Sequence, residues 1–221
     1  MKRLARSVML TVCVLVVASL ATTSQANFSG NLSAPGGGLT GTGNWATGLT
    51  FAWDIEQLVS GLWSYTYTLS LGPGIQGGLS ALILETSENL TDEGINAPVP
   101  GIDPSDPRPY SPDFAPGSRL GLPEDIFGIK FHGFADNGGP WTATFTSPRA
   151  PMPGSFYAKN GKAGGAPNTI WNTGLTEEVG GAYILVPDTV NSIMPLPGAV
   201  LLGMLGLGCA GGWLRRRRTV A

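Results

Sequence analysis

Residues 49–71 read LTFAWDIEQLVSGLWSYTYTLSL, and the alternation within this stretch indicates the fold class of the 221-residue chain. Large apolar side chains occupy every second position of residues 49–55, with smaller or polar residues between them. After a break at Ser60-Gly61, residues 63–71 alternate aromatic residues or Leu with Ser and Thr. A period of two is typical of a half-buried β-strand. The short connection between the two runs predicts an antiparallel hairpin.

Similar patterns recur along the chain. Further runs with strand character are 79–84, 126–134, 141–146, 155–158, 169–172 and 182–186, and the third of these has one apolar face and one threonine face. Together with the hairpin they give roughly eight strands, and no amphipathic helix is found among them. We therefore predict an all-β body over residues 27–190, folded as an antiparallel β-sandwich of jelly-roll type.

Two stretches of the body interrupt the strand pattern. Residues 27–47 are rich in Gly, Ser and Thr, and within them Gly36-Gly37-Gly38 is expected to be a flexible or turn segment. Eight prolines lie between Pro98 and Pro123, with acidic residues scattered among them, and no periodicity survives there. We predict a long surface loop at about 94–123, outside the core.

The charges are strongly partitioned along the chain, although the net formal charge is only −2. All fifteen Asp and Glu lie between the two terminal segments, together with six of the thirteen Lys and Arg, so the body carries a formal charge of −9. Such a body is repelled by nucleic acid, which we exclude as a partner. Cys13 and Cys209 both lie in terminal apolar runs, so a body processed at both ends contains no disulfide.

Residues 1–26 have the pattern of a secretory signal peptide. Lys2, Arg3 and Arg6 precede an apolar run over 8–20, and Ser24-Gln25-Ala26 forms a small-x-small cleavage site. This pattern predicts export through the Sec translocon and cleavage by signal peptidase between Ala26 and Asn27. The alternative is an uncleaved anchor, but the apolar run is short for a membrane span.

The C-terminal segment 194–218 combines three elements. Met194, Pro195, Leu196 and Pro197 form a Pro-x-Pro motif, and seventeen uncharged residues follow from Gly198 to Leu214. This length is at the lower limit for one transmembrane helix. The cluster Arg215, Arg216, Arg217 and Arg218 is expected to stay in the cytoplasm, which leaves the body outside. A permanent single-span anchor is the simplest reading of such a segment.

This tail resembles the PEP-CTERM sorting signal of bacterial exosortase substrates, with its Val-Pro-Glu-Pro-type motif, Gly- and Leu-rich span and terminal Arg cluster. Here Met194 stands for Val and Leu196 for Glu. The resemblance implies a transient anchor in the cytoplasmic membrane. It also implies a partner, a membrane-embedded cysteine transpeptidase that cuts near Pro195 to Pro197 and releases or re-attaches the body at the cell surface or in the extracellular matrix.

The body is similar to uncharacterised domains found upstream of such signals. The matching stretches are 79–85, 128–131, 149–159 and 168–172. In these domains the first stretch usually reads Ser-His-Phe-Ile-Leu-Glu, and here Ala81 replaces the histidine. The resemblance implies no known activity.

A search of the body for chemistry gives few candidates. His132, the only histidine, lies on a predicted strand face with Lys130, and we interpret it as a solvent-facing strand residue. Trp45 and Trp171 are candidates for stacking on sugar rings, whereas Trp53, Trp63 and Trp141 at alternating positions indicate core. No nucleophile elbow, phosphate loop or metal-ligand spacing is present, so we predict no enzymatic activity and no cofactor.

Two alternatives rest on acidic residues. Asp103, Asp106 and Asp113 in the proline-rich segment offer oxygen ligands for calcium, without any fixed ligand spacing. Glu85 with Glu124 offers a carboxylate pair for glycoside hydrolysis. The leading hypothesis is an exported, non-enzymatic surface or matrix protein. A carbohydrate-binding module of the exopolysaccharide is the first alternative, and a glycosidase is the second.

Overall fold

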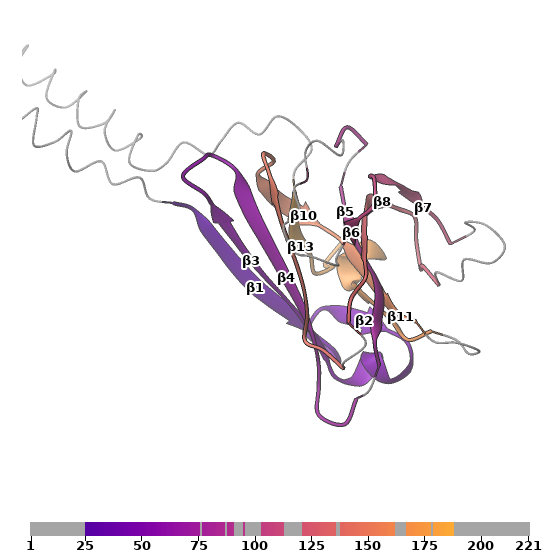
Figure 1. Cartoon of the computed structure of the whole chain (residues 1–221). Coiled ribbons are helices and arrows are strands. Elements are labelled where there is room, and N and C mark those ends of the chain that lie inside the picture. The colour runs from indigo at the N-terminus through magenta and orange to yellow at the C-terminus, as the bar shows by residue number, and fades with distance from the viewer. Residues whose placement is uncertain are drawn as a thin grey trace, which may run out of the picture. The chain divides into compact units, whose positions relative to one another are not determined.

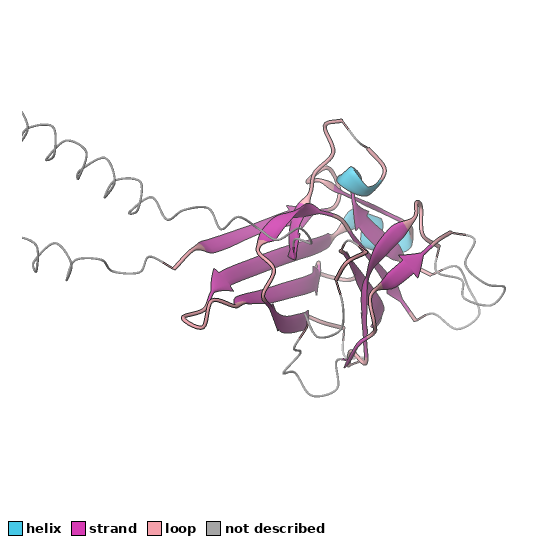
Figure 2. Cartoon of the chain, turned by 90° about the horizontal axis from the view of Figure 1, so that it is seen from above, coloured by secondary structure: helices cyan, strands magenta, loops and turns pink. Residues whose placement is uncertain are grey.

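The computed structural model describes residues 25–75, 77–86, 88–90, 95, 103–112, 121–135, 138–161, 167–177 and 179–187. Residues Ala26–Ser192 form one compact unit. Its described part consists of β-strands, turns and short helical turns, as Figures 1 and 2 show. The prediction of an all-β body is therefore confirmed, whereas the predicted signal and transmembrane helices lie outside the described residues. Within the ranges above, no helix is both long and apolar enough to cross a bilayer.

The strands are β1 (Asn27–Ser33), β2 (Leu39–Gly41), β3 (Leu49–Gln57), β4 (Trp63–Leu71), β5 (Leu79–Glu85), β6 (Asp103–Pro104), β7 (Arg108–Tyr110), β8 (Ile126–His132), β9 (Trp141–Ser147), β10 (Pro151–Gly154), β11 (Phe156–Asn160), β12 (Thr169–Asn172) and β13 (Ile184–Pro187). Two 3-10 turns, η1 (Gly43–Thr47) and η3 (Thr173–Leu175), lie beside them.

The strands form two main sheets. The smaller sheet has the order β1-β3-β4-β9, and the larger has the order β2-β12-β11-β5-β8-β6, with β7 also paired to β8. Strands β10 and β13 form a separate two-stranded ladder. All of these pairings are antiparallel. Both main sheets contribute side chains to one hydrophobic core, so the body is a sandwich-like assembly.

The predicted hairpin is strands β3 and β4, which pair over their full length from Leu49–Leu71 to Gln57–Trp63. On β4 the inward side chains are buried from Trp63 to Leu69, and the Ser and Thr residues between them are half-exposed. A strand with this division must keep its register, because a shift by one residue exchanges the two faces. The alternation seen in the sequence therefore specifies which face of the smaller sheet meets the core.

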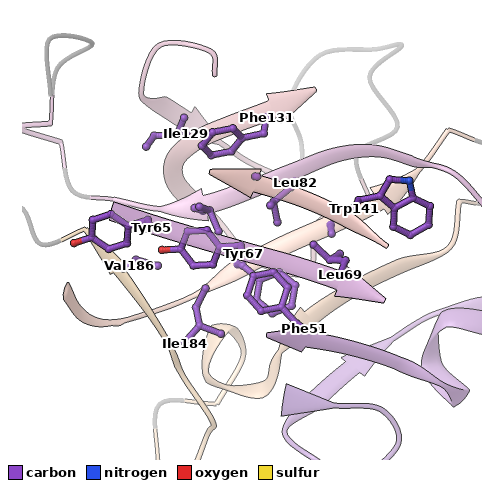
Figure 3. Close-up of a cluster of buried hydrophobic side chains, with 14 of the residues drawn as sticks. Phe51, Tyr65, Tyr67, Leu69, Leu82, Ile129, Phe131, Trp141, Ile184 and Val186 are labelled. Carbon is purple, nitrogen blue, oxygen red and sulfur yellow. The ribbon is translucent and has the colours of Figure 1, made fainter. Parts of the chain in front are cut away.

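Aromatic rings connect the two sheets across the core. Phe51 on β3 stacks on Phe156 on β11 with ring centroids 3.9 Å apart. Phe145 on β9 lies 5.4 Å from Phe131 on β8. Figure 3 shows the side chains of β4 gathered with Leu82 and residues of β8 in this core. Truncating such a buried Phe to Ala costs about 3–5 kcal/mol.

Two buried tyrosines of β4 form hydrogen bonds through their hydroxyl groups to segments outside the two main sheets. Tyr65 donates to the carbonyl of Arg149 at 2.6 Å, and Tyr67 donates to the carbonyl of Leu185 on β13 at 2.8 Å. Burial, and secondly the neighbouring Tyr65, raises the pKa of Tyr67 well above its usual value, so its hydroxyl remains a donor. Leu185 pairs with Pro153, which has no N–H to offer, and the tyrosine supplies a donor instead.

The sequence gives no strand signal over residues 27–47, although a turn is present over residues 34–36, at the start of the expected glycine segment. This stretch contains strands β1 and β2 and the turn η1, and β1 pairs with β3 along seven positions from Asn27–Glu56 to Ser33–Thr50. Gly30 allows close packing there, because a Cβ at this position would lie 2.3 Å from the ring of Trp53 on β3. Tertiary pairing overrides the weak local propensity of a Gly- and Ser-rich sequence. Trp53 itself is half-buried and packs against the core.

The proline-rich segment is also more than a surface loop. Its described residues include the edge strands β6 and β7, both paired with β8. Proline is compatible with a sheet edge, where its missing N–H is not needed for pairing. Tyr110 and Leu122 are buried in a second, small apolar cluster with Ile83, Ile126 and Tyr157. The expectation that this segment lies outside the core is therefore wrong for these residues.

Replacing Tyr67 by Phe tests the hydroxyl contact with β13. The substitution leaves the partly buried carbonyl of Leu185 without its donor, and we expect a loss of about 1–3 kcal/mol in the free energy of unfolding. Chemical denaturation measures this change. The matched control is Tyr183→Phe, because Tyr183 is 40 % exposed, and a surface change of this kind stays within about 0.5 kcal/mol. Equal stability of the two variants would contradict this role for Tyr67.

Candidate functional site

The outer face of the larger sheet, which points away from the main core, carries three of the candidate residues, Trp171, His132 and Glu85. Strand β5 lies between β11 and β8, so its outward positions Ala81 and Ile83 are flanked on both sides. Ala81 is paired with Lys159 on β11, and Ile83 is paired with Tyr157 on β11 and with Lys130 on β8. Residues on one face of paired strands are close neighbours, so this face carries both apolar and cationic groups.

The apolar part of this face is the second cluster together with Trp171. Tyr157 pairs with Trp171 on β12 and is fully buried, and burial raises its pKa above the usual value. Trp171 is half-buried and packs against the cluster. Its indole Nε1 is buried and has no hydrogen-bond partner among the described residues. The ring of Trp171 is thus only partly available for stacking on a ligand.

Three basic residues, Lys130, His132 and Lys159, lie on the same face around Ala81, and we name them the basic cluster. His132 follows Phe131, which pairs with Leu82, so the next position across β5 is Ala81. His132 is exposed, as the alternation predicts, and the two lysines are half-buried. Burial, and secondly the positive charge of Lys130, lowers the pKa of Lys159. The two ammonium groups are therefore close enough to repel each other.

Arg108, on β7 beside β8, is bound within its own strand. Its Nε donates to the hydroxyl of Tyr110 at 3.0 Å, and its guanidinium lies 5.1 Å from the centre of that ring. The same hydroxyl lies 3.0 Å from Oγ of Ser105. These contacts join residues of the proline-rich segment to one another, and they distinguish Arg108 from the basic cluster. The N–H of Lys130 on β8 donates to the same Oγ of Ser105 at 3.2 Å.

The structure places the two carboxylates of the glycosidase alternative in different roles. Glu85, at the end of β5, is half-buried, and its Oε2 accepts the N–H of Ser155 at 2.6 Å. Its own N–H donates to the carbonyl of Ser155 at 2.9 Å, so Glu85 joins β5 to the start of β11. Glu124 is exposed before β8. Because both contacts of Glu85 are with the backbone of Ser155, its role is to join β5 to β11 within the larger sheet.

Trp45 cannot stack on a sugar, and this part of the prediction is corrected. Its side chain has 0 % exposure and lies 6.3 Å from the ring of Trp141 inside the main core. The sequence did not indicate whether Trp45 is buried, because it lies in the turn η1. A turn has no alternating pattern from which the inward side can be predicted. Trp63 and Trp141 are core residues, as predicted.

The candidate calcium ligands are only partly described. Asp103 begins β6 and pairs with His132, Asp106 is exposed, and Asp113 lies outside the described residues. In the part of the chain that is described, no group of three His, Cys, Asp or Glu residues is arranged to hold a metal ion.

The outer face of the smaller sheet is a second open surface, and it is built of hydroxyl groups. Thr66 and Thr68 on β4 lie 3.3 Å, between Oγ1 atoms, from Thr144 and Thr142 on β9. The threonine face predicted for β9 is confirmed, and its residues are exposed or half-exposed. Side chains on one face repeat at about 6.8 Å along a strand and about 4.8 Å between strands. This surface is neutral over β4 and β9.

The residues of the sorting motif, Met194 to Pro197, and the cluster Arg215 to Arg218 lie outside the described residues. At the other end, Ala26 precedes β1, and Asn27 is the first residue of that strand. The carbonyl of Ala26 accepts the N–H of Gln57 at 2.9 Å. The predicted signal-peptidase site thus lies at the start of the first strand.

The sequence predicts only part of the basic cluster. Lys130 and His132 share one strand, and their alternation places them on one face. Lys159 is 27 positions beyond His132 in the chain, and only the pairing of β5 with both β8 and β11 brings it near them. The alternating pattern predicts the face of a strand but not the neighbours of that strand.

Replacing Glu85 by Ala tests the link between β5 and β11. The variant leaves the N–H of Ser155 without its acceptor, and we expect a loss of about 1–3 kcal/mol in the free energy of unfolding. Glu85→Gln keeps an oxygen acceptor and should lose less. Urea denaturation of these variants and of the exposed control Glu124→Ala measures the effect. A loss for Glu85→Ala no larger than that of the control contradicts the structural role.

No protein-family model matches this chain, and neither a curated protein nor a solved structure matches it.

Proposed function

We propose that the chain is an exported, non-enzymatic protein of the cell surface or extracellular matrix, held transiently in the cytoplasmic membrane by its C-terminal segment. An exosortase-type transpeptidase removes that segment once the body is outside. The Sec translocon and signal peptidase act on the N-terminal segment. The body then works as a binding or structural component rather than as a catalyst.

The observation that carries this proposal is the agreement between the predicted processing sites and the limits of the folded unit. The compact unit is Ala26–Ser192, its first strand begins at Asn27, and β13, its last strand in the part described, ends at Pro187. Cleavage before Asn27 and near Pro195 to Pro197 would leave every described strand whole. The first cut would remove the carbonyl of Ala26 that Gln57 uses and the contact of the small Ala26 side chain with the core.

The order of elements in the tail supports the same proposal. A Pro-x-Pro motif, an uncharged run and four arginines follow the body in that order. The signal peptide and the arginine cluster both predict that the body lies on the outer side of the membrane. The two ends of the chain therefore give one consistent topology.

The non-enzymatic role is supported by how the candidate catalytic groups are used. Glu85 binds the backbone of Ser155, and His132 is exposed on strand β8. A glycosidase would require two carboxylates facing each other across a cleft. The jelly-roll subtype of the sandwich also remains part of this proposal.

A second candidate, a carbohydrate-binding module, is favoured by the outer face of the larger sheet. The half-buried ring of Trp171 lies beside Tyr157 on the same face as the basic cluster. Aromatic rings next to polar groups are the usual arrangement for holding a sugar ring. This role is compatible with the first proposal, because a matrix protein has polysaccharide as its surroundings.

Replacing both Pro195 and Pro197 by Ala tests the processing. In the native cell we expect the double variant to remain in the membrane fraction with the mass of residues 27–221. The unaltered protein should leave that fraction with a mass that ends near the Pro-x-Pro motif. Cell fractionation followed by intact-mass measurement distinguishes these forms. The same mass also reveals any added group at the new C-terminus.

The matched control is Pro112→Ala, because Pro112 is an exposed proline of the body. Its processing should equal that of the unaltered protein. A mature protein that still contains Arg215 to Arg218, or a double variant cut as efficiently as the control, contradicts the proposed transient anchor.

A further inference from the structure

The loop that joins β3 to β4, residues 58–62, carries an exposed apolar side chain at its outer end. Val59 is 95 % exposed, and Leu58 and Leu62 at the base of the loop are half-exposed. Tight turns usually contain Gly, Pro, Asn, Asp or Ser, whose backbone freedom or short polar side chains suit the turn. Val59 makes no contribution to the core, so its apolar surface is available to a partner.

The loop has a defined shape. The N–H of Gly61 donates to the carbonyl of Leu58 at 2.9 Å, and the N–H of Leu58 donates to the carbonyl of Leu62 at 2.8 Å. Gly61 has a φ of +85°, which favours glycine. These two hydrogen bonds close the turn and leave Val59 at its outer end.

A fourth apolar side chain adjoins the loop from β1. Phe28 is 38 % exposed, and its ring lies 6.0 Å from that of Trp63, the first residue of β4. We name Phe28, Leu58, Val59 and Leu62 the apolar tip. Exposed apolar residues scattered singly are common, whereas a group of them in one place marks a contact surface for a protein or a membrane.

The chain enters the folded body beside the apolar tip. The carbonyl of Ala26 accepts the N–H of Gln57, the last residue of β3, and Asn27 pairs with Glu56. Figure 1 shows the start of β1 next to the loop that joins β3 to β4. The predicted signal-peptidase site therefore lies at the same end of the body as the apolar tip.

The last described strand also runs toward this end. Tyr67, which is two positions farther from the loop than Tyr65, contacts Leu185 of β13. Pro187 pairs with Pro151, two residues after the carbonyl that Tyr65 binds. Strand β13 thus passes from the level of Tyr67 toward the loop, and it ends at Pro187 on the side of the apolar tip.

The length of chain beyond β13 limits how far the body lies from the predicted span. Ten residues, 188–197, separate Pro187 from the start of the uncharged run at Gly198. A fully extended chain covers about 3.3–3.6 Å per residue, so Gly198 lies within about 40 Å of Pro187. If the run from Gly198 spans the membrane, the bilayer surface is within this distance of the end that carries the apolar tip.

We propose that the apolar tip is a membrane-contact surface, which enters the headgroup region of the bilayer while the C-terminal segment anchors the chain. The inference rests on the proposed transient anchor and names the partner of the anchored body, a neutral lipid surface. The body has a formal charge of −9, and Glu56 is exposed next to the loop. Anionic headgroups would repel such a body, so burial of apolar surface supplies the attraction.

The contact is weak by itself, which suits a transient anchor. The apolar tip has four side chains, of which Leu58 and Leu62 are only half-exposed, and even a whole acyl chain gives only marginal, reversible membrane binding. An anchor makes the second contact intramolecular, at an effective concentration of about millimolar. The apolar tip therefore holds the body against the bilayer while the anchor is present, and removal of the anchor releases the body.

The test uses the full chain, with its C-terminal segment, reconstituted in vesicles of phosphatidylcholine. Replacing Cys13 and Cys209 by Ser removes both native cysteines, and Val59→Cys then carries one environment-sensitive fluorophore. Lipids with a spin label near the headgroup quench a fluorophore that lies in the membrane interface. We expect severalfold stronger quenching at position 59 than at the control position, and no dependence on salt.

The matched control is Val179→Cys, because Val179 is a valine of similar exposure, 93 %. It lies in the loop after η3, whose Thr173 donates to the carbonyl of Gly38. Gly38 follows the end of β1 that is far from Asn27, so this loop belongs to the opposite end of the body. A fluorophore at position 179 should be quenched no more than one on a protein that does not touch the vesicle.

A variant assigns the contact to the apolar tip. With the fluorophore moved to Leu62→Cys, the substitution Val59→Asp should abolish the quenching, because it removes apolar surface and adds a charge that is costly to desolvate. Position 59 is exposed, so the fold should be unaffected. A thermal unfolding curve for each variant checks this. Unchanged quenching in the folded Val59→Asp variant overturns the proposal.

Flotation of the vesicles separates failure of this proposal from failure of the anchor. Chains that float with the vesicles but are quenched equally at positions 59 and 179 overturn the membrane contact and leave the anchor intact. Chains that do not float overturn the anchor and this proposal with it. Cross-linking between two copies through position 59, without quenching by the lipid, assigns the apolar tip to a second copy of the chain and also overturns the lipid contact.

Discussion

Strand β4 divides its side chains strictly between a buried aromatic face and a hydroxyl face, and both sheets depend on this division. Its inward residues Trp63, Tyr65, Tyr67 and Leu69 contact the core, and the hydroxyls of the two tyrosines reach the carbonyls of Arg149 and Leu185. The strand is paired on both sides, with β3 and with β9. A shift in its register would expose the aromatic residues and detach β13 from its donor.

Each main sheet has one face in the core and one outer face. The core faces are occupied by packing, so the groups of the two sheets that are available to a ligand or partner lie on the outer faces. The smaller sheet presents neutral hydroxyl groups over β4 and β9, and the larger presents aromatic and basic groups around β5. Neither surface requires a catalytic constellation for the proposed role of contacting polar material. The two terminal segments predict only the proposed location of the body outside the cell.

Periodicity predicted the all-β class, the β3–β4 hairpin and the core positions of Trp63 and Trp141, because a half-buried strand must alternate. It did not find strands β1 and β2 within residues 27–47 or the strands of the proline-rich segment, because pairing with β3, β12 or β8 rather than local composition creates them. It also failed for Trp45, which lies in a turn. Sites such as the basic cluster depend on strand order, and a single sequence does not contain that order in any local pattern.

The compact unit Ala26–Ser192 is a self-sufficient, sandwich-like body organised around β4. The most direct test is native-state amide hydrogen exchange on this segment produced without either terminal region. We predict that the amides of β3, β4 and β9 exchange slowest and together, with the free energy of global unfolding, because they form the most protected ladder. Rapid exchange in β4 while other strands stay protected, or a segment without any protected amides, would contradict the claim.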